Sequence, residues 1–328
     1  MKIGIIGFGG LGKAFVRLLE ESELKYKIIF ILRKNGGIID ENGLDIYNII
    51  KNEDDISKHS KWKNGLDFYN SINSKVDLLI EVSSTNIVNG EPAMSYIKTA
   101  LSKGINVVTA NKGPILFGYD SLRKLAKENK VFLGIGCTTG GALPSIDTGI
   151  IGCSGSKINE IEGILNGTSN YILKEMEVNN LSYKDALIKA QDLGIAEVNP
   201  NLDVEGYDTA IKILILANVL MGSKIKLKDI EIEGITQVTK EKINIAKSKG
   251  NKIKLIGRAK LIDDKVRVSV EIEEINNSHP LFMVDDKNKG VVYRTDNLGD
   301  ITVIGGASSP RNSAASLMRD IINNIKIR

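Results

Sequence analysis

An acid and a lysine one helical turn apart are the residues of this chain whose spacing best suits proton transfer. Asp208 and Lys212 are four residues apart and share one helix face. From residue 209 onward nearly all positions are apolar, which predicts a helix that is buried on most sides and ended by Gly222. The ordinary interpretation is an exposed ion pair. The functional interpretation is that the two residues belong to a polar pocket that binds an ammonium group and donates a proton.

Two more acids, Asp203 and Glu197, precede this helix and flank an Asn-Pro-Asn break. Together the segment reads A-E-x-x-P-x-x-D-V-x-G-x-D-x-A-x-K-x-x-I-L-A, which resembles the homoserine dehydrogenase family. The resemblance implies that Lys212 is the catalytic acid and that Asp208 positions it. It also implies that Glu197 and Asp203 bind the substrate ammonium group.

Length and composition exclude several classes of protein. The chain of 328 residues is long enough for two domains. It has no apolar run of about 18 residues and no signal-peptide layout, which predicts a cytoplasmic protein without a membrane partner. Its two cysteines make no disulfide framework, and its two distant histidines make no metal cluster. Its 44 basic and 40 acidic residues are mixed along the chain, so we expect no nucleic-acid partner.

The start of the chain predicts a dinucleotide site. A short apolar strand leads into G-x-G-x-x-G and then into a helix. Gly7 permits the tight turn, Gly9 lets a pyrophosphate approach the backbone, and Gly12 lets the helix pack on the strand. Gly10 and Leu11 of the same loop complete this set of cofactor-binding candidates, and the N-terminus of the helix that follows faces the phosphates.

The second strand, residues 26–34, ends in Arg33 and Lys34, where an acidic residue would bind the ribose 2′-hydroxyl. Either these are two solvated loop cations, or they bind the 2′-phosphate of NADP. We therefore predict NADP in preference to NAD.

Two further strands end in polar residues. The strand 76–85 finishes with Ser84 and Thr85, and the strand that starts at residue 105 finishes with Asn111 and Lys112 before a Gly-Pro closure. A helix is expected to follow over residues 120–130. The carboxyl ends of parallel strands line the cofactor crevice. A solvated loop lysine is the ordinary interpretation of Lys112. The string T-A-N-K-G-P also resembles the family pattern, which implies that Lys112 is a second catalytic residue.

A glycine-rich hinge, residues 137–144, leaves the first domain. The family usually has a glutamate ahead of this loop, associated with a monovalent cation held mainly by backbone carbonyls. The aligned position here is Gly136. The resemblance therefore leaves open a monovalent cation, without a confident metal ligand.

The second half predicts an α+β domain with an open sheet. A strand is expected over residues 231–236, and residues 252–262 and 265–275 predict a β-hairpin around Asp263-Asp264. Its G-x-x-N-G-T-x-N-Y-I-L pattern predicts a capping turn, and the resemblance adds substrate contacts from Gly167 and Thr168. In the family such a sheet packs against its twin, which implies a homodimer. The closing helix resembles one that returns to the first domain and brings Gly306 near the nicotinamide.

These patterns predict an α/β chain with a Rossmann-type doubly wound sheet and an α+β substrate and dimerisation domain. The expected domains are 1–136 and 137–304, with 305–328 as the returning helix. The resemblance implies NAD(P)H-dependent interconversion of L-aspartate 4-semialdehyde and L-homoserine in threonine and methionine biosynthesis, without a fused kinase or regulatory domain. The alternatives are another two-domain NAD(P)-dependent oxidoreductase of amino-acid metabolism and a non-catalytic NADP-sensing protein.

Overall fold

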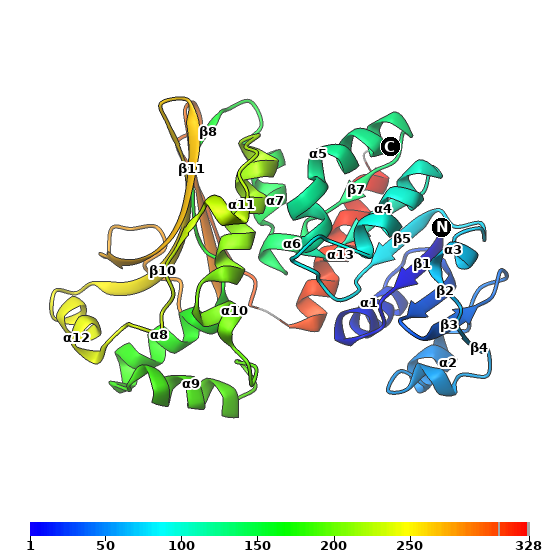
Figure 1. The fold of residues 1–328 in the computed structure, drawn as a ribbon, viewed down its shortest axis with the longest axis horizontal. Coiled ribbons are helices and arrows are strands. Elements are labelled where there is room, and N and C mark those ends of the chain that lie inside the picture. Colours follow the sequence, from blue (N-terminus) through cyan, green and yellow to red (C-terminus); the bar gives the residue numbers. More distant parts are fainter. Residues whose placement is uncertain (308, 327–328) are drawn as a thin grey trace. The chain divides into compact units, whose positions relative to one another are not determined.

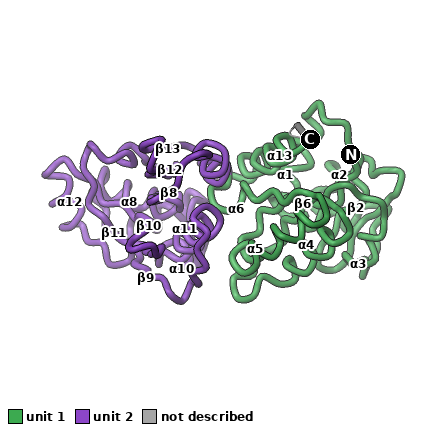
Figure 2. The backbone as a smooth tube through the Cα atoms, turned by 90° about the horizontal axis from the view of Figure 1, so that it is seen from above, with its two compact units in different colours: residues 1–141, 309–328 green, residues 142–308 purple. Residues whose placement is uncertain are grey.

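The protein folds into two compact units, seen in a computed structural model that describes residues 1–307 and 309–326 (Figure 2). The first unit consists of Met1–Gly141 and Ser309–Arg328, and the second is Ala142–Ser308. The last helix of the chain therefore belongs to the unit that contains the amino terminus.

These boundaries differ slightly from those expected. The domain limits predicted after residues 136 and 304 lie a few residues before the observed ones. Within the described ranges, no helix has both the length and the apolar character needed to cross a membrane.

A seven-stranded sheet forms the centre of the first unit. Its strands, in the order in which they lie side by side, are β4 (Trp62–Asn64), β3 (Gly36–Ile39), β2 (Lys27–Arg33), β1 (Lys2–Ile6), β5 (Leu78–Glu81), β6 (Asn106–Thr109) and β7 (Leu133–Gly134). The strands from β2 to β7 in this order run parallel, and β3 and β4 are antiparallel at one edge. The order reverses beside β1, and such sheets bind ligands outside the carboxyl ends of the strands at that point.

Helices cover this sheet because each buries one apolar face on it. They are α1 (Gly10–Glu20), α2 (Ile46–Lys51), α3 (Phe68–Ser71), α4 (Ala93–Ser102), α5 (Lys112–Glu128), α6 (Cys137–Gly140) and α13 (Pro310–Lys326), with one 3₁₀ turn, η1 (Ile56–Lys58). The first and last helices, α1 and α13, lie side by side (Figure 1). Phe15 and Leu19 of α1 share a fully buried core with Leu317 and Ile321 of α13. The two ends of the chain therefore stabilise one core.

One predicted helix is preceded by a further helical segment within α5, which has a kink at Gly118 with φ of −149° and ψ of 19°. The sequence predicted a helix over residues 120–130, with Gly-Pro closing the preceding strand. Instead α5 begins at Lys112, because the side chain of Asn111 caps it by accepting a hydrogen bond from Gly113 N. Proline is tolerated in the first turn of a helix, where its missing N–H has no partner to lose. Lys112 is therefore the first residue of a helix, not the last of a strand.

The second unit is built on a six-stranded sheet. In their side-by-side order the strands are β13 (Asp300–Gly305), β12 (Lys289–Thr295), β8 (Ile158–Ile164), β10 (Lys252–Ile262), β11 (Lys265–Ile275) and β9 (Glu231–Ile232). The predicted hairpin of β10 and β11 is confirmed, and its turn residues Asp263 and Asp264 have φ of 48° and 58°. The strand predicted over residues 231–236 is only two residues long and runs parallel to β11.

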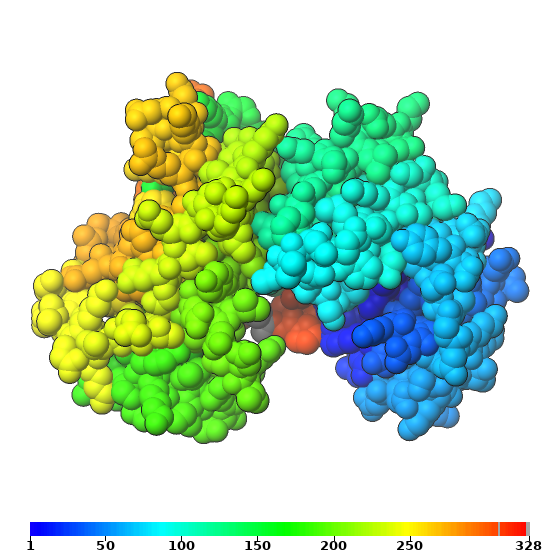
Figure 3. Space-filling model, viewed as in Figure 1, coloured from blue at the N-terminus to red at the C-terminus, as the bar shows by residue number. Residues whose placement is uncertain are grey.

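The remaining elements of the second unit are mostly helical. They are α7 (Ser145–Asp147), the π-helical turn η2 (Thr148–Gly152), α8 (Gly167–Asn179), α9 (Tyr183–Asp192), α10 (Asn201–Val204), α11 (Tyr207–Leu220), the 3₁₀ turn η3 (Leu227–Asp229) and α12 (Lys240–Ser248). The exposed side of α12 is yellow in the space-filling view (Figure 3). Most side chains of α11 are buried, as predicted, and the helix ends just before Gly222.

Close packing places α11 on the sheet. A Cβ atom at Gly257 of β10 would lie 3.0 Å from Thr209 and 3.1 Å from Ile213. The glycine therefore lets the helix approach the strand closely. The fold class is the predicted one, a Rossmann-type α/β sheet with a second α+β unit.

Candidate active site

The glycine turn after β1 has the geometry of a pyrophosphate site. Gly7 has φ of 95°, in the left-handed region, and its Cβ would collide with the backbone of Val82. A Cβ at Gly12 would lie 2.3 Å from Gly7 O, so α1 packs against the turn only because residue 12 is glycine. In contrast, among the residues that the structure describes, no atom beyond the two chain neighbours lies within 4 Å of the Cβ position of Gly9. The backbone is open there, beside the first residues of α1, Gly10 and Leu11.

The basic residues after β2 lie on the surface. Arg33 ends the strand, Lys34 follows it, and both are exposed. The segment that contains Asp55 and Lys58 lies close enough to interact with Arg33. The pKa of Asp55 is lowered first by a hydrogen bond from Ser57, and further by the charges of Lys58 and Arg33. Arg33 and Lys34 therefore form a basic surface at the end of β2, and Asp55 is a carboxylate that interacts with it.

A buried acid that sequence reasoning missed connects the ends of β5 and β6. Glu81 accepts hydrogen bonds from Ser83 N at 3.0 Å, from the Ser83 hydroxyl, and from the Thr109 hydroxyl at 3.0 Å. Burial raises the pKa of Glu81. Asn111 Nδ2 lies 3.4 Å from both Ser83 O and Ser84 O. Glu81 thus stabilises the loops that carry the predicted cofactor residues.

The predicted residues of this region differ in exposure. Ser84 and Thr85 are exposed, Asn111 is buried, and Lys112 is partly buried. Glu81 lies inside the apolar run of a strand, and an acid there is the signal that could have identified it.

A cavity of about 250 Å³ in the second unit brings together most of the predicted catalytic and substrate residues. It contains both members of the Asp208–Lys212 pair and the second carboxylate, Asp203. The remaining lining residues are Asn166, Gly167, Thr168, Leu193, Gly194, Ile195 and Lys287. Its charged side chains are two carboxylates and two lysines.

The Asp208–Lys212 pair is not an exposed helix pair. Lys212 Nζ donates to Asp208 Oδ2 at 2.5 Å and to Leu165 O at 2.9 Å. The Lys212 and Asp208 side chains are only 13% and 11% exposed. The interpretation as an ordinary solvated ion pair is therefore wrong. Most neighbouring positions of α11 are apolar and buried, so this pair is the charged part of a mostly apolar helix.

Asn166, which sequence reasoning did not include among the site residues, holds the two carboxylates. Its Nδ2 donates to Asp203 Oδ1 at 2.6 Å and to Asp208 Oδ2 at 2.8 Å. Its Oδ1 accepts from Ser169 N at 2.8 Å, so the same side chain caps α8. The predicted capping turn was therefore correct, but it serves the cavity as well.

The first residues of α8 form one wall of this cavity. A Cβ at Gly167 would lie 2.8 Å from Lys287 O, so glycine is required for the contact with that segment. The Thr168 hydroxyl donates to Ile195 O at 3.2 Å. These contacts connect the helix start to the two loops that complete the lining.

Several predicted residues are not among those that line this cavity, including Lys112 of the first unit, Glu197 and Gly306. Glu197 is exposed and is not among the lining residues. Gly306 has φ of 65°, and its Cβ would lie 2.4 Å from Leu143 N. Its position therefore reflects a tight backbone contact within the second unit, and its proximity to nicotinamide stays a prediction.

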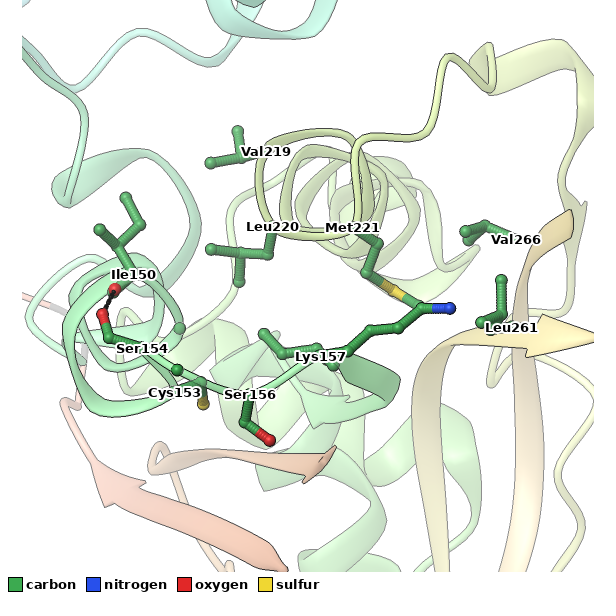
Figure 4. A pocket seen from close by; sticks show the side chains of 13 residues that line it. Ile150, Cys153, Ser154, Ser156, Lys157, Val219, Leu220, Met221, Leu261 and Val266 are labelled. Carbon is green, nitrogen blue, oxygen red and sulfur yellow. Dashed lines mark hydrogen bonds between the residues drawn. The ribbon is translucent and has the colours of Figure 1, made fainter. Parts of the chain in front are cut away.

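A second hollow of about 330 Å³ lies beside the end of α11 (Figure 4). Its wall contains Leu220, Met221, Leu261 and Val266, and Lys157 also lines it. No carboxylate lines it among the described residues, so it lacks a partner for a substrate ammonium group. The cavity with the Asp208–Lys212 pair is the better site for an amino-acid substrate.

The residues present fit the implied dinucleotide cofactor better than they fit the implied cation. The open backbone at Gly9 suits a dinucleotide pyrophosphate. Gly136 supplies no side-chain oxygen, and its N–H donates to Asp320 Oδ2 at 2.9 Å. No group of three or more His, Cys, Asp or Glu side chains in the described ranges could hold a metal ion.

Two protein-family models match this chain, one over the segment with the glycine turn and one over the segment with the cavity. Residues 7–133 match the family model "Homoserine dehydrogenase, NAD binding domain", and residues 144–322 match the model "Homoserine dehydrogenase". Homoserine dehydrogenase of Methanocaldococcus jannaschii is 35% identical over 98% of each chain. The NAD(+)-dependent homoserine dehydrogenase of Pseudomonas canavaninivorans is 33% identical over 98% of this chain and 95% of its own.

Solved structures extend the match to three dimensions. The chain aligns with S. aureus homoserine dehydrogenase at a TM-score of 0.80 and 30% identity, covering 100% of this chain and 76% of that one. The lysine–carboxylate cavity, the glycine turn and these whole-chain matches lead to one conclusion: the chain belongs to the homoserine dehydrogenase family.

Proposed function

We propose that Lys212 is the acid–base catalyst in the NAD(P)-dependent interconversion of L-homoserine and L-aspartate 4-semialdehyde. The observation that carries this proposal is the largely buried Asp208–Lys212 pair in a cavity with a second carboxylate. The bound nicotinamide supplies or accepts the hydride. Lys212 donates a proton to the carbonyl oxygen as charge develops there, and in the reverse direction it accepts the hydroxyl proton. Asp208 keeps the amine oriented.

The other predicted residues have supporting roles in this proposal. Asp203 binds the substrate ammonium group, since only its Oδ1 accepts from Asn166 and its other oxygen has acceptor capacity left. Gly167 and Thr168 at the start of α8 contact the substrate. Lys112 is proposed as the second lysine of the reaction, and Glu197 as a further contact to the ammonium group.

A coupled assay tests the reaction directly. Adding L-homoserine and NADP to the protein should produce NADPH, seen as its absorbance, with no turnover when homoserine is omitted. A cofactor-sensing protein would bind NADP without this turnover. Another amino-acid oxidoreductase would prefer a different alcohol in a panel of small hydroxy amino acids.

Arg33→Ala is expected to reduce kcat/KM for NADPH by about tenfold with a much smaller loss for NADH. Arg33 and Lys34 stand at the end of β2, where the 2′-phosphate of NADP would lie. We therefore propose NADP preference, although the Pseudomonas canavaninivorans relative is described as NAD(+)-dependent. The measurement is steady-state kinetics with both cofactors, and Lys51→Ala on the nearby α2 is the control. Equal losses with the two cofactors would contradict this role of Arg33.

A homodimer is proposed from the family resemblance and from the open sheet of the second unit. Helix α11 covers one face of β8, β10 and β11, whereas the opposite face presents charged side chains such as Arg258 and Arg294. Light scattering at micromolar concentration should give twice the chain mass of 35.8 kDa. A monomer mass would contradict the proposal. Cytoplasmic location and a role in threonine and methionine biosynthesis likewise stay predictions.

A further inference from the structure

Lys287 is a cationic residue of the cavity that neither the sequence patterns nor the proposed mechanism uses. It lines the cavity beside Gly167, where its backbone carbonyl oxygen lies 2.8 Å from the Cβ position of that glycine, and the residue is exposed. Within the described part of the chain, no ion pair is recorded for it, whereas the other cavity lysine, Lys212, is engaged by Asp208. The free cation of the cavity is therefore on the loop between β11 and β12.

The charges that remain in the cavity match those of a free amino acid. Lys212 and Asp208 neutralise each other at 2.5 Å. This leaves one carboxylate, Asp203, and one ammonium group, that of Lys287. A zwitterionic amino acid carries an ammonium group and a carboxylate. Electrostatic complementarity therefore pairs its ammonium group with Asp203 and its carboxylate with Lys287.

The loop that carries Lys287 is held on both sides of this residue. Asn170 Nδ2 donates to Val284 O at 3.1 Å and to Asp286 O at 3.0 Å, and lies 3.4 Å from Asn288 O. Because Asn170 belongs to α8, the same helix supplies the cavity wall at its first turn and the loop contacts one turn later.

A buried lysine completes this arrangement. Lys254 is 1% exposed, and its Nζ donates to Asn170 Oδ1 at 2.9 Å, Val284 O at 2.6 Å and Asp285 Oδ1 at 2.9 Å. Lys252 donates to the other oxygen, Asp285 Oδ2, at 2.7 Å. We call Asn170, Lys252, Lys254 and Asp285 the loop clamp. Its contacts restrict the backbone on each side of Lys287.

We propose that Lys287 recognises the α-carboxylate of the substrate, held in place by the loop clamp. This proposal rests on the reaction proposed above and adds the basis of its selectivity for free amino acids. A substrate in which the carboxylate is a neutral amide would lose this interaction, while its hydroxyl and ammonium groups would still bind. Lys287 is thus a specificity-determining residue and not the proton donor.

The test compares L-homoserine with L-homoserinamide in the wild type and in Lys287→Met. Methionine keeps the length of the side chain and removes its charge. The variant should raise KM for L-homoserine by about tenfold with little change in kcat, and should leave the kinetics with the amide nearly unchanged. Lys287→Arg should restore most of the lost affinity. Lys184→Met, an exposed lysine of α9 outside the cavity, is the matched control.

Several outcomes would overturn this assignment. If Lys287→Met affects the acid and the amide equally, or affects neither, Lys287 does not recognise the carboxylate. Calorimetric binding of L-homoserine to the enzyme with reduced cofactor, which cannot oxidise it, separates this failure from a wrong reaction. A wild type that binds and oxidises L-homoserine, with equal affinity in Lys287→Met, refutes only the role of Lys287. A wild type that neither binds nor oxidises it refutes the reaction and this proposal with it.

Discussion

Replacing Lys212 with methionine should lower kcat for L-homoserine oxidation by ~10²-fold or more. Methionine preserves the helix propensity and most of the volume of lysine, but it cannot transfer a proton. Lys212 Nζ is the cationic donor beside Asp208, and Asn166 still donates to that carboxylate when the amine is absent. The fold should therefore survive. Steady-state kinetics, with circular dichroism to check folding, provides the measurement.

The control for this prediction is Lys184→Met, which removes an exposed lysine from the same unit and should leave kcat unchanged. Asp208→Asn should give a smaller loss than Lys212→Met, because it removes the group that positions the amine and not the amine itself. Near-normal turnover in a folded Lys212→Met protein would remove Lys212 from the mechanism. Loss of folding in both Lys212→Met and Asp208→Asn would show instead that the pair is needed for structure.

Asp285→Ala should destabilise the second unit by about 3 kcal/mol. Asp285 is the carboxylate that pairs with Lys252 and Lys254, and Lys254 is 1% exposed. Without it the Lys254 ammonium group stays buried among neutral acceptors, which is costly. Glu274→Ala is the matched control, since the Glu274–Lys249 pair lies at the surface, and its effect should be much smaller.

The measurement must report on the second unit. The only tryptophan, Trp62, lies in the first unit, so its fluorescence follows the wrong part of the chain. Hydrogen exchange in increasing urea, read at the amides of β10 and β12, is the suitable probe. Equal stability of wild type and Asp285→Ala would show that the buried lysine has another way to be neutralised.

The effect of this substitution should depend on pH. Burial opposes ionisation of Asp285, but hydrogen bonds from Lys252 and Lys254 outweigh it and hold the pKa below its ordinary value of 3.8. A carboxyl whose folded-state pKa is lowered stabilises the fold above its ordinary pKa, and this contribution is lost as the pH falls toward the lowered value. The stability difference between wild type and Asp285→Ala should thus be full near about pH 7 and shrink below about pH 4. An unchanged difference at low pH would contradict this linkage.

Local patterns determined the elements and part of the site. The Asp208–Lys212 pair follows from a spacing of four on a helix, a relation set by the helix itself. The glycine turn depends on residues 7 to 12, where φ and backbone approach are local properties. The β10–β11 hairpin follows from two alternating runs around Asp263 and Asp264. Each of these signals lies within a single window of sequence.

Boundaries were less predictable than the elements themselves. The start of α5 was misplaced because the Gly-Pro after Lys112 was interpreted as a strand closure, although the cap from Asn111 allows proline in the first turn. A single dipeptide supports both interpretations, and the packing of the helix selects one of them.

The sequence by itself determined that the chain has a dinucleotide turn and a helix with a lysine paired to an acid. Only the tertiary structure decided which other groups meet them. Asn166 reaches Asp208 across 42 residues of chain, and Lys254 reaches Asn170 across 84. Such contacts depend on how α8, α11 and β10 pack together, and no local periodicity encodes that packing. For the same reason the burial of Lys254 in β10 and the position of Lys287 beside the cavity could not be predicted from the sequence.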